Sequence, residues 1–385
     1  MNFTVRALEG SAAGAFMASS WAELYRQDPE ATPYQSPSWL TGWAQQLPPT
    51  ARLVTALCED PARQIVAALP LVHDHEGDRV RTYALSVPMG EYARAVGPAA
   101  EDPRVSASLA RFLEELTYDG HHVDIAGLPA AGTLARQLTL TGPASAGLWH
   151  TSVTDYAEIP LPLTYEEMSR STRRDHKRRQ RTWDELAKSH EVTYHRTRDS
   201  DELLSAYAVL TRLHARRWAA RTPPPGSPHT PDAPDWQAVL RRCGPNTAFV
   251  ATLALDTEVV AAQLCLTRHR RAYSVVPAIH PHYKDIAPGH ALLRHLTQDL
   301  TSAGYEYLDL GRTVPGQHAY KNQYRPRWSK TVSAVSAPPR VCLGDSGSAR
   351  TTPEPRRPRP PQPVEAVPLA PERSRDFVHE LAREL

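Results

Sequence analysis

The sequence predicts a mixed α/β fold, with two mixed β-sheets and helices packed on them. The main observation is a repeat: three apolar strands, an amphipathic helix and a further strand occur in the same order twice, about 190 residues apart. A meander of strands followed by a helix that crosses to another strand is typical of an α/β layer fold. The chain has 385 residues, of which 41% are hydrophobic, so it can bury the cores of two or three domains.

The first three strands of each unit give the clearest match. Residues 53–72 read LVTALCEDPARQIVAALPLV, and residues 249–266 read FVATLALDTEVVAAQLCL. Each segment holds two apolar runs around a turn that contains an aspartate, which predicts a hairpin. A third strand follows in each unit, at residues 81–87 and 271–278.

The helix and the last strand of each unit also correspond. Amphipathic patterns predict helices over residues 105–118 and 290–302. Each pattern stops before a glycine, Gly120 or Gly304, and glycine suits the left-handed conformation that ends many helices. The strand after each helix carries an aspartate, which is Asp124 in HHVDIAGL and Asp309 in YEYLDLGR.

The units divide the chain into two halves and a tail. We expect an N-terminal half over residues 1–150 and a C-terminal, donor-binding half over residues 151–336. Ten of the 36 prolines fall in the first 35 residues of the segment 337–375, which predicts a disordered tail. Residues 376–385, DFVHELAREL, predict a short terminal helix.

Charge and cysteine content exclude several classes of protein. The net charge of +2 does not fit a globally basic DNA-binding protein. The four cysteines are far apart and form no CxxC pair, so we expect reduced thiols and no zinc site. His73, Asp74 and His75 could suggest a metal site, but they lie in an expected turn. We therefore expect no metal site there. The N-terminus lacks a signal peptide and no apolar run is long enough to span a membrane, so the sequence predicts a cytoplasmic protein.

An ordered set of six segments extends over about residues 30 to 335 and resembles one protein family. The chain looks like the CelD-type acetyltransferases, which are tandem GNAT proteins related to the FemABX aminoacyltransferases. The resemblance implies a tandem GNAT fold and transfer of an acyl group to an amine without a covalent acyl-enzyme. The segments are PYQSPSWLTGW (33–43), VDIAGLP (123–129), STRRDHKRRQRTWDEL (171–186), LHARRW (213–218), APGHALL (287–293) and LDLGRTVPGQHAYKNQY (308–324).

The APGHALL segment predicts where the acyl donor binds. Gly289, His290 and Ala291 begin the second predicted helix, whose first-turn N–H groups suit a phosphate. The family pattern places Arg or Gln where this chain has Ile286, which weakens the case for an ordinary coenzyme A cradle. Arg173 and Arg174 belong to a basic helical run, Arg170 to Arg181, and are further candidates for phosphate contacts.

Candidate catalytic residues come from the family match and from the chemistry of amide formation. Lys321 follows a glycine-containing loop at the position of a functional FemABX lysine, and would hold a phosphate or stabilise an oxyanion. Tyr320, or its neighbour Tyr324, would relay a proton to the leaving group. The base that neutralises the amine is expected to be Glu91, with Asp309 and His214 as alternatives. Asp309 aligns with Asp124 in the repeat, so the other interpretation of Asp309 is a structural role that both residues share. His214 is expected to lie on a helix surface.

Three aromatic residues, Trp39, Trp218 and Tyr92, are candidates for the acceptor pocket; for the tryptophans, core packing is the alternative. The expected acceptor is a small-molecule or peptide amine, in specialised-metabolite or cell-envelope biosynthesis. The donor is expected to be acyl-CoA or a carrier-protein thioester, with no permanently bound cofactor. Aminoacyl-tRNA is the alternative donor. A non-catalytic scaffold that recruits partners through the proline-rich tail is the third hypothesis.

Overall fold

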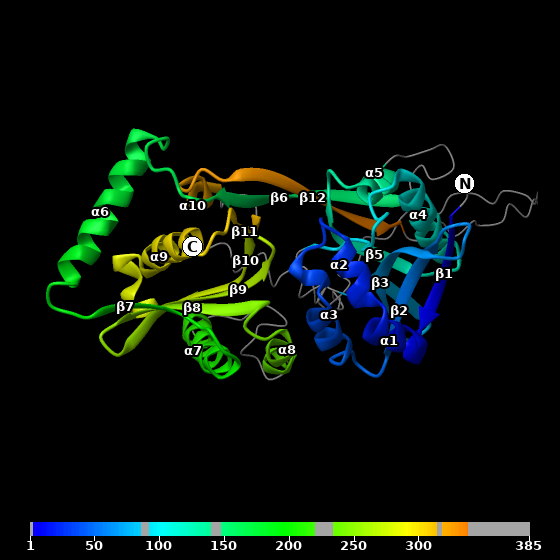
Figure 1. Cartoon of the computed structure of the whole chain (residues 1–385), viewed down its shortest axis with the longest axis horizontal. Coiled ribbons are helices and arrows are strands. Elements are labelled where there is room, and N and C mark those ends of the chain that lie inside the picture. The colour runs from blue at the N-terminus through cyan, green and yellow to red at the C-terminus, as the bar shows by residue number, and fades with distance from the viewer. Residues whose placement is uncertain (1–2, 86–91, 140–147, 220–233, 314–317, 338–385) are drawn as a thin grey trace, which may run out of the picture.

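In the computed structural model, the strands of both halves form one 12-stranded sheet with helices on both faces (Figure 1). The structure describes residues 3–85, 92–139, 148–219, 234–313 and 318–337. The strand order is β1-β2-β3-β4-β5-β12-β6-β11-β10-β9-β8-β7. The strands are β1 (Thr4–Glu9), β2 (Ala51–Glu59), β3 (Ile65–Glu76), β4 (Arg79–Ala84), β5 (His122–Pro129), β6 (Trp149–Pro160), β7 (Val192–Arg196), β8 (Ala248–Leu255), β9 (Glu258–Arg268), β10 (Arg271–Ile279), β11 (Tyr307–Thr313) and β12 (Arg327–Ser336).

The helices include the two that the repeat predicts, α4 and α9. Their N-termini lie two residues before the predicted starts, because each begins with a proline that suits the first helical position. The helices are α1 (Gly10–Ser19), α2 (Trp21–Gln27), α3 (Pro37–Ala44), α4 (Pro103–Tyr118), α5 (Thr133–Thr139), α6 (Arg170–Leu186), α7 (Ser200–Trp218), α8 (Trp236–Cys243), α9 (Pro288–Ser302) and α10 (His318–Asn322), with short 3-10 turns η1 (Pro33–Gln35) and η2 (Pro281–Ile286).

The mixed α/β fold and the internal repeat are confirmed. Strands β2 and β3 form one predicted hairpin, and β8 and β9 form the other. The parallel pair β4–β5 places Tyr83 opposite Asp124, and the parallel pair β10–β11 places Tyr273 opposite Asp309. Both helices that lead into these last strands end before a glycine with positive φ, as predicted.

The expected division into two sheets is wrong, because the last strand crosses from one half to the other. Strand β12 pairs antiparallel with β5 of the first half and with β6, and β6 pairs with β11 of the second half. These pairings close two sheet edges that would otherwise expose unpaired backbone groups. The two repeat units thus share one sheet.

Helices cover both faces of this sheet. Helix α7 packs on one face of β8 and β9, and α9 packs on the other face (Figure 1). One hydrophobic cluster contains residues of α3, α7 and α8, so a continuous core joins the two halves beneath the sheet. Within the described residues, no helix has the length and apolar character needed to cross a membrane. The predicted terminal helix, and the predicted tail apart from Ala337, lie outside the described residues.

Candidate active site

Asp309 lies at the centre of a contact between the two halves. Its side chain is on β11 and the residue is only 5% exposed. The hydroxyl of Tyr92, which precedes α4 in the first half, donates a hydrogen bond to Asp309 Oδ2. Asp309 Oδ1 accepts the backbone N–H of Gly311 at 2.5 Å. A buried carboxylate from one half is therefore held by a phenol from the other.

The backbone around Asp309 opens the sheet. The parallel pairing of β10 with β11 ends at Tyr273 and Asp309, although β10 continues to Ile279 and β11 to Thr313. Gly311 has a φ of +70°, and the register of β11 against β6 shifts between Asp309 and Arg312. Ligands of α/β sheets bind where parallel strands end and part. Asp309 occupies such a point.

Lys321 holds this irregular part of β11 together. The residue is on α10, is 7% exposed, and donates from Nζ to the carbonyl oxygens of Leu310, Gly311 and Arg312, at 2.9, 2.7 and 2.7 Å. An ammonium group has three N–H donors. The sequence led us to expect that Lys321 binds a phosphate or an oxyanion. In this structure all three N–H donors instead bond carbonyl oxygens, and the ammonium stabilises the backbone beside Asp309.

Several groups act on the ionisation of Asp309. Burial raises the pKa of the Asp309 carboxyl above its ordinary value, and the hydrogen bonds from Tyr92 and Gly311 oppose that rise. The positive charges of Lys321 and Arg271 also lower this pKa. A carboxylate with a raised pKa is a stronger base than an exposed one, so it is better suited to accept a proton.

Among the described residues of the first half, the position that matches Asp309 has a different environment. Asp124 is at the matching position, but Arg81 contacts its Oδ2 at 2.8 Å and both side chains remain partly exposed. The alignment of Asp309 with Asp124 is confirmed by their positions, whereas their environments differ. At the start of α4, Asp102 caps the helix through its own side chain, which accepts the N–H of Arg104. This carboxylate disfavours an anion at the first-half helix.

Aromatic residues from both halves surround Tyr92. Tyr34 contacts Tyr92, Tyr273 and Trp39 at ring-centroid distances of 6.0, 6.0 and 5.7 Å. Tyr156 lies 4.8 Å from Tyr92. Trp39 and Tyr92 are thus in one cluster, and all of these residues are buried.

Trp218 belongs to a different environment. It ends α7, is 2% exposed, and contacts His214 and the guanidinium of Arg217. His214 is also buried, so its predicted place on a helix surface is wrong. The reason is its spacing from Leu210 and Trp218, which puts all three on the buried face of α7.

The predicted phosphate cradle is covered by α6. Ala287 precedes α9 without a side-chain cap, and a Cβ at Gly289 would lie 3.3 Å from Ile279, so this glycine permits close packing. The indole N–H of Trp183 on α6 donates to the carbonyl of Ile286 at 2.8 Å. The space between α6 and α9 beside His290 and Ala291 is about 30 Å³, close to the volume of one water molecule.

Arg179 and Gln323, which the sequence did not single out, fill this junction together with the candidates His290 and Tyr324. Arg179 donates to Gln323 Oε1 at 2.7 Å and lies 3.3 Å from Nδ1 of His290. The Tyr324 hydroxyl also bonds that Nδ1. The signal was present as helical spacing, since His176, Arg179 and Trp183 recur at intervals of three and four residues and share the inner face of α6.

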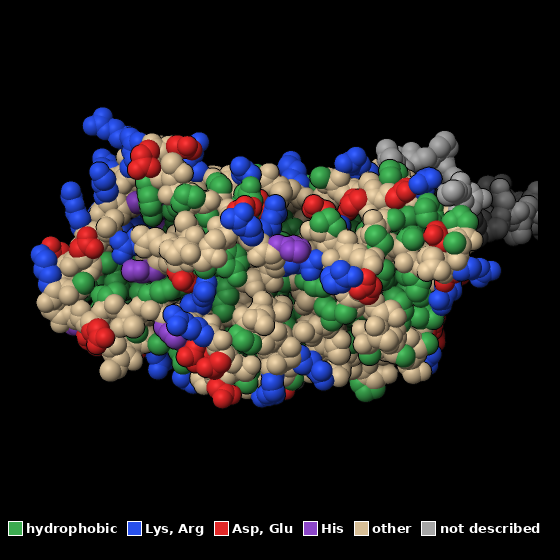
Figure 2. Space-filling model, viewed as in Figure 1, with side chains coloured by type: hydrophobic (Ala, Val, Ile, Leu, Met, Phe, Trp, Pro, Cys, Tyr) green, Lys and Arg blue, Asp and Glu red, His purple; other side chains and the backbone are tan. Residues whose placement is uncertain are grey.

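Arg173 and Arg174 are not brought together with Gly289, His290 and Ala291. They belong to the outer basic face of α6, which lines an open surface hollow of about 1180 Å³. Lys and Arg side chains gather at this end of the molecule (Figure 2). The outer basic face consists of Arg170, Arg173, Arg174, Lys177, Arg178 and Arg181.

Two further candidates have separate outcomes. Tyr320 packs against His290 and Tyr324, at 5.0 and 5.7 Å, and burial raises the pKa of Tyr320 to about 12. Its contacts therefore place it at the α6–α9 junction. Glu91, the expected base, lies outside the described residues.

The fold and these residues can now be compared with known proteins. Residues 170–322 match the acetyltransferase (GNAT) domain family. That match includes α6, the α9 segment, Asp309 and Lys321. A comparison with curated protein sequences gave no match.

Solved structures with a similar fold extend the likeness to both halves. The C-terminal domain of a putative lysylphosphatidylglycerol synthetase from Agrobacterium fabrum has a TM-score of 0.53 at 13% identity, covering 83% of this chain and 91% of that one. L-PGS from Bacillus licheniformis has a TM-score of 0.52 at 13% identity, with 81% and 90% covered. FemX has a TM-score of 0.53 at 10% identity, with 82% and 94% covered. The chain thus has the GNAT acyltransferase fold in a FemX-like arrangement.

Proposed function

We propose that this protein is an N-acyltransferase that joins an activated acyl group to an amine, with Asp309 as the base. The observation that carries the proposal is the buried Asp309 carboxylate, which lies where β10 and β11 part and bonds Tyr92 of the other half. An amine must lose a proton to become an amide nitrogen, and a carboxyl with a raised pKa can accept it. The GNAT match over residues 170–322 supports acyl transfer as the reaction class.

The proposed reaction needs no covalent acyl-enzyme. The amine nitrogen attacks the carbonyl carbon of a thioester, so an N–C bond forms and the C–S bond breaks. Asp309 takes the proton from nitrogen, and that proton then passes to the leaving thiolate, which restores the carboxylate. Tyr92 and the Gly311 N–H hold the two carboxylate oxygens during these steps.

The first choice of donor is a thioester of coenzyme A or of a carrier protein. In the described conformation the space beside His290 and Ala291 has room for about one water molecule. A donor phosphate at the start of α9 would therefore require α6 to move. Binding of coenzyme A would show as a rise in melting temperature, and its absence would count against this donor.

The second candidate donor is aminoacyl-tRNA, and the outer basic face of α6 favours it. Basic residues at positions 170, 174, 177, 178 and 181 are exposed on this face, where they would contact phosphates without regard to base sequence. The face carries no exposed aromatic residue, so base readout is not expected there. FemX and the lysylphosphatidylglycerol synthetase domain share the fold, which makes this donor worth testing directly.

The acyltransferase proposal is tested by amide formation with the purified chain, a panel of amines and each donor class. We expect Asp309→Asn to lower turnover at least about 100-fold, the usual contribution of a general base. Asp124→Asn is the matched control, because it changes the corresponding residue of the first half and should leave turnover intact. Transfer with neither donor would favour the scaffold hypothesis, and full turnover by Asp309→Asn would exclude Asp309 as the base.

The two donors are distinguished by RNA binding. If tRNA phosphates lie along α6, the triple variant Arg174→Ala/Lys177→Ala/Arg178→Ala should bind tRNA more weakly, and the slope of log K against log salt should fall by about 3. The control removes three exposed arginines elsewhere, Arg111, Arg241 and Arg242. Equal loss in both triples would indicate nonspecific attraction and would count against the tRNA donor.

A further inference from the structure

The short segment that carries Tyr92 is held in place at nearly every residue. The carbonyl of Tyr92 accepts a hydrogen bond from Gln35 Nε2. Ala93 N–H donates to the Gly127 carbonyl at 3.1 Å, and Val96 exchanges two backbone hydrogen bonds of 2.8 Å with Ala68. These bonds restrain the backbone from Tyr92 to Val96 and so fix the start of the Tyr92 side chain.

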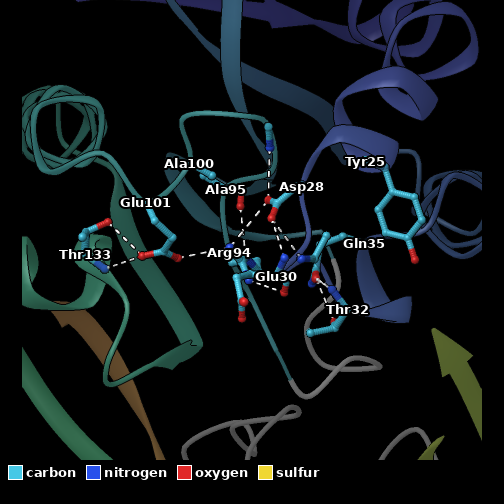
Figure 3. A network of polar contacts seen from close by, with 12 residues as sticks. Tyr25, Asp28, Glu30, Thr32, Gln35, Arg94, Ala95, Ala100, Glu101 and Thr133 are labelled. Carbon is cyan, nitrogen blue, oxygen red and sulfur yellow. Dashed lines mark hydrogen bonds and ion pairs between the residues drawn. The ribbon is translucent and has the colours of Figure 1, made fainter. Parts of the chain in front are cut away.

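Asp28 and Arg94 form the centre of this restraint (Figure 3). They are 2% and 7% exposed, and Asp28 Oδ2 lies 3.5 Å from Arg94 Nη2. The same Oδ2 accepts the Gly97 N–H at 3.2 Å, whereas Oδ1 accepts the N–H groups of Glu30 and Ala31 at 2.9 and 3.1 Å. Asp28 thus links the segment before η1 to the segment that carries Tyr92.

Arg94 extends the network toward α5. Its Nη1 donates to the Glu30 carbonyl, and its Nη2 lies 3.1 Å from Glu101 Oε1. Glu101 Oε2 in turn accepts the N–H and hydroxyl of Thr133, at 2.9 and 3.1 Å (Figure 3). The arginine is therefore bonded on both sides of the Tyr92 segment.

The second half is attached to the same network. Arg268 on β9 donates from Nη2 to the carbonyls of Tyr25 and Asp28, both at 2.7 Å, and its guanidinium lies 3.6 Å from the Tyr25 ring centroid. Two contacts between the halves, Arg268 with Asp28 and Tyr92 with Asp309, are thus connected through Asp28 and Arg94. Bonded residues of the first half thus connect Arg268 and Asp309, which both belong to the second half.

We infer that Asp28, Arg94 and Gln35 are positioning residues, which hold the Tyr92 hydroxyl on Asp309 and so set the basicity of that carboxylate. The inference rests on the proposed function, because it concerns the same Asp309 centre. It assigns the first half a role in the reaction. These residues act through Tyr92 and contact no substrate.

The test must account for every charged or titratable group that faces Asp309. Among the described residues, these are Tyr92 before α4, Lys321 on α10, Arg271 and Tyr273 on β10, and Glu158 on β6. Of these, Tyr92 is the group that the Asp28–Arg94–Gln35 network holds. A change in the network should therefore raise the pKa of Asp309, as loss of the Tyr92 hydroxyl does.

The experiment is a double-mutant cycle on the full chain between Asp28→Asn and Tyr92→Phe. Since the Tyr92 hydrogen bond lowers the pKa of Asp309, either variant should move the acidic limb of the rate profile to higher pH. Each should lower kcat by about tenfold, the value of one hydrogen bond, without changing donor KM by more than about twofold. The double variant should be no slower than Tyr92→Phe alone, because both changes remove the same interaction.

A second variant and a control separate positioning from stability. Gln35→Glu keeps the oxygen that accepts two bonds from Thr32 and removes the donor to the Tyr92 carbonyl, so it should produce the same shift. Glu59→Gln weakens another ion pair of the first half, the 2.5 Å contact of the buried Glu59 with the partly exposed Arg6, which has no link to Tyr92. We expect this control to leave the pH profile unchanged.

A titration of carboxyl-¹³C-labelled aspartate by NMR gives a readout that does not need turnover. The Asp309 resonance, assigned by its loss in Asp309→Asn, should titrate at higher pH in Asp28→Asn, Gln35→Glu and Tyr92→Phe. An unchanged Asp309 titration in the two network variants, with a shift in Tyr92→Phe, would overturn the inference. Full activity of Tyr92→Phe and Asp309→Asn would instead exclude Asp309 as the base of the proposed reaction, and the NMR result would still decide the positioning role.

Discussion

Tyr92 donates its hydroxyl to Asp309 although 217 positions separate the two residues in the chain. The contact joins a segment of the first half to a strand of the second, at the point where β10 and β11 part. Neither half contains this centre alone. The exchange of β12, which pairs with β5 and β6, keeps the halves in one sheet and so makes a shared centre stable.

The buried carboxyl should make stability depend on pH. Because the folded-state pKa of Asp309 is raised, the native protein binds this proton more tightly than the unfolded chain does. The contribution of Asp309 to the free energy of unfolding therefore falls as pH rises through that raised pKa. Melting temperatures from pH 4 to 8 should show a shallower decline in Asp309→Asn than in the wild type. Parallel curves would contradict this account of Asp309.

Replacement of Lys321 should weaken the fold before it affects chemistry. Lys321→Met leaves three carbonyls, of which that of Gly311 is buried and the other two are partly buried, without their charged donor, so we expect the free energy of unfolding to fall by about 3 kcal/mol. Lys330→Met, at an exposed position of β12, should change it by less than about 0.5 kcal/mol. Denaturant unfolding measures both. Lost turnover with unchanged stability would show that Lys321 acts on the reaction directly.

His290 should destabilise the protein in acid. Burial, with the charges of Arg179 and His176, lowers the pKa of His290 to about 3, so the folded protein keeps this ring neutral where the unfolded chain protonates it near 6.5. Its contribution to stability is therefore present at neutral pH and is lost as pH falls from about 6.5 toward 3.

His290→Asn keeps an acceptor for the Tyr324 hydroxyl but cannot titrate. Its melting temperature should fall less between pH 7 and pH 4 than that of the wild type. The exposed His150, changed to Asn in the same way, serves as the control. An unaltered acid dependence in His290→Asn would show that other groups cause it.

Two glycines should respond oppositely to alanine. Gly97 has a φ of +147°, and a Cβ there would lie 2.4 Å from the Val66 carbonyl oxygen, so Gly97→Ala should cost about 2–4 kcal/mol. Gly14 is inside α1 with open space around it, so Gly14→Ala should stabilise by about 0.5–1 kcal/mol. Thermal unfolding distinguishes the two, and a neutral Gly97→Ala would mean that the Tyr92 segment tolerates displacement.

The candidate centre was partly predictable. Asp309 was a candidate because of its place in the repeat, and Lys321 and Tyr92 were candidates from the sequence as well. The sequence did not predict how the three residues contact one another. Asp309 and Asp124 have matching strands and matching neighbours in sequence, so local pattern assigns them one role. Their different roles arise because Tyr92 reaches one and Arg81 the other.

The basic helix shows the same limit. The sequence predicts a positively charged helix over Arg170 to Arg181, but it does not distinguish one arginine of this helix from another. The fold separates them: Arg179 turns inward to Gln323 and His290, whereas Arg174 and Lys177 line the outer surface. Which face of a helix is buried depends on what packs against it, and Trp183 at the Ile286 carbonyl provides that contact.

The α/β class, the repeated order of elements and the glycine ends of α4 and α9 could all be predicted from local sequence patterns. These features depend on apolar periodicity and on backbone preferences within a few residues, so they are encoded locally. The tertiary structure decided that the two units share one sheet through β12, that α6 covers the start of α9, and that Tyr92 meets Asp309. Each of these contacts joins segments distant in sequence, and its stability comes from the packing of the whole core rather than from either segment alone.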